Sequence, residues 1–187
     1  MPVILGIDPG SLKTGFGVID VRGGKARYVA SGIIKLPAVA LPERLRIIHA
    51  GVAEIIATHS PTEMAVEDVF FARDPRAALK LGQARGAAIV AGVQVGLPVA
   101  EYSAKTVKQS VVGTGAATKD QVSHMVVRLL SLEAAPREDA ADALAVALCH
   151  AHSLRTAISL ATKVAGKGRA VVSSRYARGR LKEIHHK

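Results

Sequence analysis

The sequence has one cysteine, no tryptophan and few aromatic residues, and these shortages exclude several classes of protein. The single cysteine, Cys149, cannot form an internal disulfide, which excludes the disulfide-rich secreted scaffolds and predicts a cytoplasmic location. Aromatic residues make up only 3% of the chain, so the core must be built from aliphatic side chains. Because hydrophobic residues nevertheless reach 49%, a disordered chain is also excluded.

Long hydrophobic runs are missing as well. Asp8 interrupts the early apolar run, so we expect no N-terminal signal sequence. The most apolar long stretch, residues 86–100, contains Gln94 and Pro98 and is too short to span a bilayer. A chain of 187 residues is long enough for one domain with a substantial core.

The charge is unevenly distributed along the chain. The formal net charge is +10, and nine Lys or Arg with a single acid lie between residues 155 and 187, which leaves only +2 for the remainder. A basic segment predicts a polyanionic partner, with nucleic acid first, although a solvated tail that only aids solubility fits the charge equally well. We therefore predict a folded domain over 1–154 and a basic, flexible tail over 155–187.

Turn signals divide the chain into a series of expected elements. Pro9-Gly10 and Gly23-Gly24 separate three consecutive apolar segments, and such short connections favour antiparallel strands. Apolar residues recur at helical spacing after Pro42, and Thr118 opens a capping box with Gln121. The predicted fold is α/β, with a five-stranded mixed sheet of three antiparallel N-terminal strands and then two parallel strands, flanked by helices. The expected strands are 3–8, 14–21, 26–35, 63–67 and 97–101, and the expected helices follow Pro42, span 74–93, follow Thr118 and span 137–154.

Four carboxylates stand where acids are unusual. Asp8 and Glu67 each end an apolar strand, while Asp139 and Asp142 share one face at the start of the last helix. Each has an ordinary explanation alone, as a turn cap, a strand-end carboxylate or an acid that complements the helix dipole. No Lys or Arg stands beside them in a way that predicts simple ion pairing, and a buried charge is costly unless it is paired or bound to a metal. The four together therefore favour a divalent metal site.

The residue types in this set indicate which metal and which chemistry to expect. Carboxylates are the natural ligands of Mg²⁺, with Mn²⁺ as a substitute, and no His–Cys cluster predicts zinc. Two such ions, about 3.5–4 Å apart, would stabilise the attacking and leaving oxygens of a phosphoryl displacement.

Five segments in order resemble the RuvC family of Holliday junction resolvases. They are GIDPGSLKTGFGVID, AVEDVFF, KLGQARG, TVKQSVVGTGAATKDQVSHMV and EDAADALAVALCHAH, and the resemblance covers residues 3–154. It implies a ribonuclease H-like fold and a homodimer that nicks two strands of like polarity in a four-way DNA junction, with two Mg²⁺ ions per site. It also implies a role in recombination and repair, with docking to the RuvA–RuvB branch-migration complex.

The resemblance assigns roles to particular residues of this chain. Asp8, Glu67, Asp139 and Asp142 match the catalytic, metal-binding acids of the family, and some members have His at the fourth position. Lys119 matches a catalytic and DNA-binding lysine. The other DNA-binding residues that the resemblance implies or favours are Phe70, Arg73, Arg76 and Lys108. Without the resemblance, Lys108 and Lys119 would be interpreted as solvated loop lysines, and Phe70 and Phe71 compete for the base-stacking role, with core packing favoured for Phe71.

Two other functions compete with a nuclease. An actin-like ATPase shares the early run of Asp8, Gly10, Gly15 and Gly17, but it needs a second lobe and a second phosphate loop, and the sequence has neither. A non-catalytic DNA-binding module would suit the basic tail, but it gains nothing from carboxylates beside phosphates. The Ala- and Gly-rich helix at 77–92 is the candidate dimer interface, although it could instead only pack on the sheet.

Overall fold

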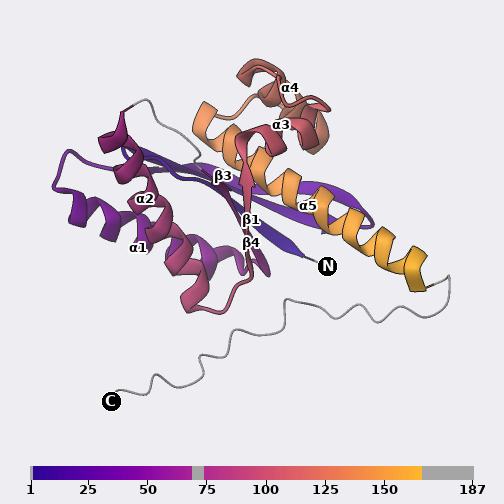
Figure 1. Cartoon of the computed structure of the whole chain (residues 1–187), viewed down its shortest axis with the longest axis horizontal. Helices are drawn as coiled ribbons and strands as arrows, with labels where there is room; N and C mark the ends of the chain where they lie inside the picture. Colours follow the sequence, from indigo (N-terminus) through magenta and orange to yellow (C-terminus); the bar gives the residue numbers. More distant parts are fainter. Residues whose placement is uncertain (1, 69–73, 166–187) are drawn as a thin grey trace, which may run out of the picture. The chain divides into compact units, whose positions relative to one another are not determined.

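The computed structural model describes residues 2–68 and 74–165, with side chains as far as residue 162 (Figure 1). Five strands form one sheet in the order β3-β2-β1-β4-β5. The strands are β1 (Val3–Asp8), β2 (Lys13–Arg22), β3 (Lys25–Lys35), β4 (Glu63–Asp68) and β5 (Val99–Ser103). The helices are α1 (Leu41–His59), α2 (Pro75–Gln94), α3 (Ala104–Val112), α4 (Lys119–Leu130) and α5 (Glu138–Ala165).

The strand pairing confirms the predicted mixed sheet. β1 pairs antiparallel with β2, and β2 pairs antiparallel with β3. β4 runs parallel to β1 on one side and to β5 on the other. Because β1 and β4 are parallel neighbours, their carboxyl ends lie side by side at one edge of the sheet.

The helices agree with the predictions in kind, with two differences. The predicted capping box is confirmed, since Thr118 Oγ1 accepts from the Gln121 amide and the Gln121 side chain accepts from the Thr118 amide. Helix α3 was not predicted. It is short, it begins where Ser103 Oγ accepts from the Thr106 amide, and it ends at Gly113, whose φ is 92°. Helix α5 also continues to Ala165, beyond the end expected at residue 154.

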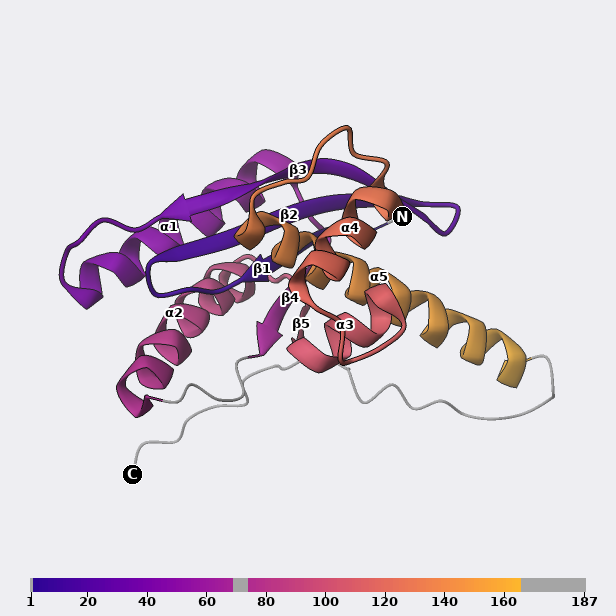
Figure 2. The same cartoon turned by 90° about the horizontal axis from the view of Figure 1, so that it is seen from above.

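Two hydrophobic clusters lie on opposite faces of the sheet within the unit Met1–Arg155 (Figure 2). Helices α1 and α2 cover one face, and α3, α4 and the first part of α5 cover the other. The stretch Glu138–Thr162 is long and apolar enough to cross a membrane, but half of its most apolar window is buried in the protein, as in a core helix. The central position of α5 brings its acidic N-terminus to the sheet edge where β1 and β4 end.

Glycines in β1 and β2 allow α5 to lie directly on the sheet backbone. A Cβ atom at Gly6 would stand 2.1 Å from the Ala143 carbonyl oxygen, and one at Gly15 would stand 2.0 Å from the Asp139 carbonyl oxygen. A Cβ atom at Gly17 would stand 2.7 Å from Leu144 Cγ, which is also too close. Any side chain at these positions would push α5 outward, so the three glycines set the distance between the helix and the strands.

Candidate active site

The strand-end acids come together because β1 and β4 are adjacent. Ile7 pairs with Val66 in the parallel register, so the following residues, Asp8 and Glu67, lie side by side where the pairing of β1 with β4 ends. Their carboxyl groups share a hydrogen bond. A hydrogen bond between two carboxyls requires a proton on one of them.

Helices α3, α4 and α5 complete the site around this pair. A pocket of about 300 Å³ is lined by Asp8 and Glu67 from the strands, Asp142 from α5, Lys108 from α3 and Lys119 from α4. Apolar atoms from the same helices close its walls, contributed by Ala104, Val107 and Val122. The structure thus brings three of the four predicted acids and both predicted lysines into one pocket.

Asp139 lies next to this pocket without lining it. It is one turn before Asp142 on α5 and is close enough to act electrostatically on both Asp8 and Asp142. Its side chain faces a neighbouring depression, where Asp139 Oδ2 lies 3.6 Å from Lys13 Nζ.

The electrostatics of the pocket favour a bound cation. Burial, followed by the charge of Glu67, raises the pKa of Asp8 to about 8. Burial also raises the pKa values of Glu67 and Asp142, although Lys119 opposes both shifts and Lys108 opposes that of Glu67. Three carboxyls that resist ionisation in one pocket are under-compensated by the protein itself, and a divalent cation would remove that cost.

Two acids have cation partners that were not expected. Lys119 Nζ lies 3.5 Å from Asp142 Oδ2 and 2.5 Å from Glu138 Oε1, and these carboxylates raise the pKa of Lys119, Glu138 most strongly. Together with the pairing of Lys13 and Asp139, this makes the expectation of unpaired acids wrong for Asp139 and Asp142. Asp8 and Glu67 have no salt bridge among the described residues.

The donor set fits Mg²⁺ or Mn²⁺ in chemistry, because it consists of carboxylate oxygens. Within residues 2–68 and 74–165, no three His, Cys, Asp or Glu side chains already stand around one point as a closed ligand cage. Mg²⁺ usually keeps several waters and takes only one or two carboxylates, so an open arrangement suits it better than a closed cage would.

Some predicted DNA-binding residues lie elsewhere. Arg76 is exposed in the first turn of α2, where its amide donates to Asp74 Oδ1, and it does not line the pocket described here. Phe70, Phe71 and Arg73 lie outside the described residues.

Lys13 and Glu138 are the nearby residues that sequence reasoning missed. Glu138 directly precedes Asp139, so its place in the acidic start of α5 was a usable signal. Lys13 gave no such signal, because its proximity to Asp139 depends on how α5 crosses β2. Both change the charge at the edge of the pocket.

The tight packing of the early glycines also bears on the ATPase alternative. Gly15 and Gly17 lie within β2 and are covered by α5, so they do not form an open loop that could hold a nucleotide phosphate. Their role in this fold is close helix–sheet approach.

Comparison with known proteins identifies the family of this chain. The family model for the crossover junction endodeoxyribonuclease RuvC matches residues 4–150. The RuvC of Tolumonas auensis is 58% identical over 90% of this chain and 98% of its own length. The RuvC of Idiomarina loihiensis is 56% identical over 97% of this chain and 100% of its own length.

Solved structures of Holliday junction resolvases share the fold of this chain. Thermus thermophilus RuvC in complex with a Holliday junction substrate superposes with a TM-score of 0.80 at 41% identity, covering 84% of this chain and 97% of that one. The yeast mitochondrial Holliday junction resolvase shares the fold, with a TM-score of 0.61 at 10% identity over 86% of this chain and 85% of that one. This chain belongs to the RuvC family of crossover junction endodeoxyribonucleases.

Proposed function

We propose that this protein is a structure-selective endonuclease that resolves four-way Holliday junctions by nicking two strands of like polarity, in recombination and repair. The observation that carries this proposal is the pocket in which Asp8, Glu67 and Asp142 meet two lysines. Such a pocket suits a phosphodiester, since carboxylates hold the metal ions that a phosphate approaches and lysines bind the phosphate itself. Membership of the RuvC family supports the same substrate.

The proposed roles follow from the positions of the side chains. Asp8, Glu67, Asp139 and Asp142 would hold two Mg²⁺ ions, which supply a nucleophilic water and stabilise the charge that develops on the phosphate. Lys108 lines the pocket from α3 and is placed to contact a backbone phosphate. Lys119 is held at the edge by Glu138 and Asp142 and is placed to offset negative charge on the substrate.

A nicking assay tests this function directly. We expect the full chain with Mg²⁺ to cut a synthetic four-way junction at symmetric positions, with little cutting of a linear duplex or single strand of the same sequence. EDTA should abolish cutting, and Mn²⁺ should restore it. Tight junction binding without cutting in either metal would favour the non-catalytic DNA-binding module instead.

We also propose that the protein is a homodimer through α2, which would give it two equal active sites for a nearly two-fold symmetric junction. The stripe of α2 opposite its buried face is small or apolar. Cβ atoms added at Gly82 and Gly86 would meet nothing within 4 Å, so a second backbone has room to approach there. The same stripe exposes large apolar side chains, namely Leu79, Val90 and Val93 at 69%, 47% and 57%. An exposed apolar stripe of this kind favours an interface with a second helix rather than a surface that faces water.

Gly86→Arg should convert the dimer to a monomer, because a long charged side chain would occupy the space that a second helix needs. Analytical ultracentrifugation at micromolar concentration measures this change. Ala57→Arg, at an exposed position of α1, is the matched control and should remain dimeric. A monomeric wild-type protein, or a dimeric Gly86→Arg variant, would contradict this interface.

We also propose roles for residues outside the pocket, a docking partner and a location. Phe70 would stack on bases near the crossover, with Arg73 and Arg76 on nearby phosphates. Residues 155–187 would add salt-sensitive, non-specific affinity for DNA to a nuclease domain over 1–154. Docking to the RuvA–RuvB complex and a cytoplasmic location are proposed on family membership, and the reduced, buried Cys149 agrees with that location.

A further inference from the structure

A second group of cations lies beside Asp139, in a depression that Lys108 does not line. Lys13 begins β2 and Lys35 ends β3, and the two residues are direct partners in the antiparallel register. Cross-strand partners point to the same face of a sheet. Lys13 reaches Asp139 on α5, so this is the face that α5 covers. The third cation, Arg137, directly precedes α5.

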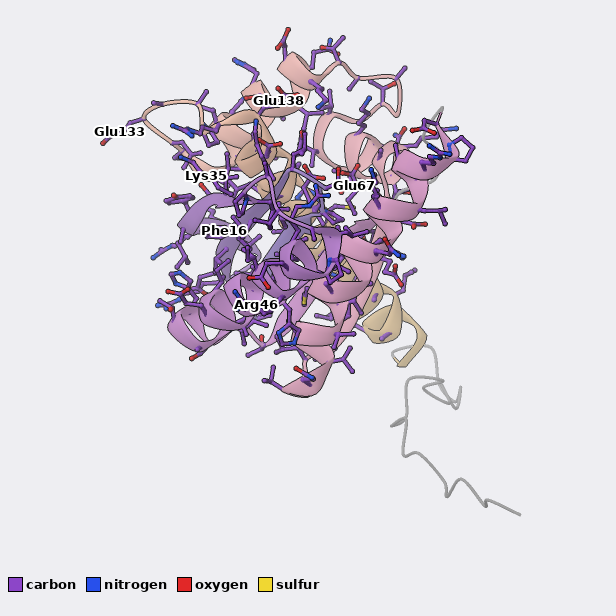
Figure 3. All side chains as sticks on the ribbon, turned by 90° about the vertical axis from the view of Figure 1, so that its left-hand side faces the viewer. Phe16, Lys35, Arg46, Glu67, Glu133 and Glu138 are labelled. Carbon is purple, nitrogen blue, oxygen red and sulfur yellow. The ribbon has the colours of Figure 1, made fainter. Side chains whose placement is uncertain are left out.

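These three cations line one groove. A depression of about 550 Å³ is lined by Lys13, Lys35 and Arg137, together with Asp139 and the exposed Leu12. A second depression of about 690 Å³ shares Lys35, Arg137 and Ile33 with the first. We call the two together the β3 groove, and the labels of Lys35, Glu133 and Glu138 help to locate it in Figure 3. The groove begins at the active-site acid Asp139 and continues along the outer strand of the sheet.

The fold compensates these charges only in part, through Asp139, Glu138 and Glu133, which line the same groove. Like charges directly opposite each other on two strands are destabilising, which applies to Lys13 and Lys35. A cation at the N-terminus of a helix is opposed by the helix dipole, which applies to Arg137. Lys35 and Arg137 form no salt bridge within the described part of the chain, and Lys13 has only Asp139. An anion in the groove would offset all of these costs.

We propose that the β3 groove binds the DNA backbone phosphates of a junction arm beside the active site. This inference rests on the proposed function, because the acids mark where the cut strand passes. Lys108 and Lys119 line the acid pocket, and Lys13, Lys35 and Arg137 line the neighbouring depression. A strand that runs from the pocket into the groove would therefore meet cations in both. Phosphate contacts of this kind fix register and orientation without reading sequence.

The test removes two of these cations without touching an acid. In the full chain carrying Asp8→Asn, which we expect to bind junctions without cutting them, Lys35→Ala with Arg137→Ala should flatten the dependence of junction affinity on salt. Each lost phosphate contact lowers the slope of log K against log salt by about 0.9, so the double variant should lose about 2. The matched control is Lys25→Ala with Arg27→Ala, which removes the same charges from the other end of β3. An unchanged slope, or an equal loss in the control, would overturn the proposal.

A crosslinking measurement gives an independent readout. Because the only natural cysteine, Cys149, is buried, a thiol-reactive photocrosslinker can be attached selectively at Lys35→Cys. We expect crosslinks to one junction arm near the crossover, and none above background from the same probe at Lys25→Cys. Equal crosslinking from both positions would contradict the proposal that the β3 groove binds a junction arm. If the wild-type protein failed to nick junctions while these binding results held, the proposed nuclease function would be wrong, but the proposal that the β3 groove binds DNA would remain.

Discussion

Asp8→Asn is expected to reduce Mg²⁺-dependent cleavage of a four-way junction by at least about 10²-fold, the scale on which one electrostatic group in an active site acts. Asp8 lies at the centre of the acid set, hydrogen-bonded to Glu67 and within electrostatic reach of both acids of α5. Asparagine keeps the size of the side chain but removes the charge that would hold a cation. Junction binding in EDTA should persist or improve, since one repulsion against phosphate is lost.

The same substitution should stabilise the metal-free protein. Burial and Glu67 raise the pKa of Asp8 from 3.8 to about 8 in the folded state, so the ionised carboxylate opposes folding. This cost is absent below about pH 4 and grows as the pH rises toward 8. Asp8→Asn should therefore raise the free energy of unfolding at pH 8 by roughly 0.5–2 kcal/mol, the range of single stabilising substitutions.

Chemical denaturation at pH 4 and pH 8 without metal measures this effect, beside Glu54→Gln as a matched loss of an exposed carboxylate on α1. The control should alter neither stability nor cleavage. If Asp8→Asn lost stability and junction binding together, Asp8 would be a folding residue, and the proposed metal site would have to be abandoned.

The part of the site that could be predicted from sequence is the part that local patterns encode. Asp8 and Glu67 end apolar runs, which is visible in one dimension, and parallel strands bring such ends together. The salt bridge between Lys119 and Glu138 spans two helices and depends on their packing, so no local pattern encodes it. The charge balance at the edge of the pocket was therefore the least predictable feature.

In the fold, too, local patterns predicted some elements, while others depend on tertiary packing. Alternating apolar segments and turn residues predicted the three antiparallel strands, and the capping box at Thr118 predicted the start of α4. Helix α3 was missed because its nine residues are mostly polar or β-branched and carry a weak helical signal, and its Ser103 cap only becomes clear once β5 is placed. The glycines of β1 and β2 were visible, but their meaning depended on which element packs over them.

Gly15→Ala is expected to lower cleavage strongly although Gly15 touches neither metal nor substrate. A Cβ atom there would stand 2.0 Å from the Asp139 carbonyl oxygen, so the start of α5 must move outward and carry Asp139 and Asp142 with it. A displacement of about 1 Å at a catalytic group can cost about 10²-fold in rate. Because the new contact is with backbone, no change of rotamer can relieve it. Overpacking should also cost about 1–3 kcal/mol of stability.

Comparison with Gly51→Ala separates positioning of the acids from general loss of fit. Gly51 lies in α1 on the other face of the sheet, where the atoms nearest to an added Cβ belong to the Ile34 side chain and not to backbone, with Cδ1 at 2.9 Å. Gly51→Ala should therefore cleave at the wild-type rate. For Gly15→Ala, we expect the single-turnover rate at saturating protein to fall much more than junction affinity in EDTA, since Lys108 and Lys119 lie on α3 and α4 and only Arg137 would move with α5. A normal single-turnover rate in a folded Gly15→Ala protein would mean that the close approach of α5 to β2 does not set the position of the acids.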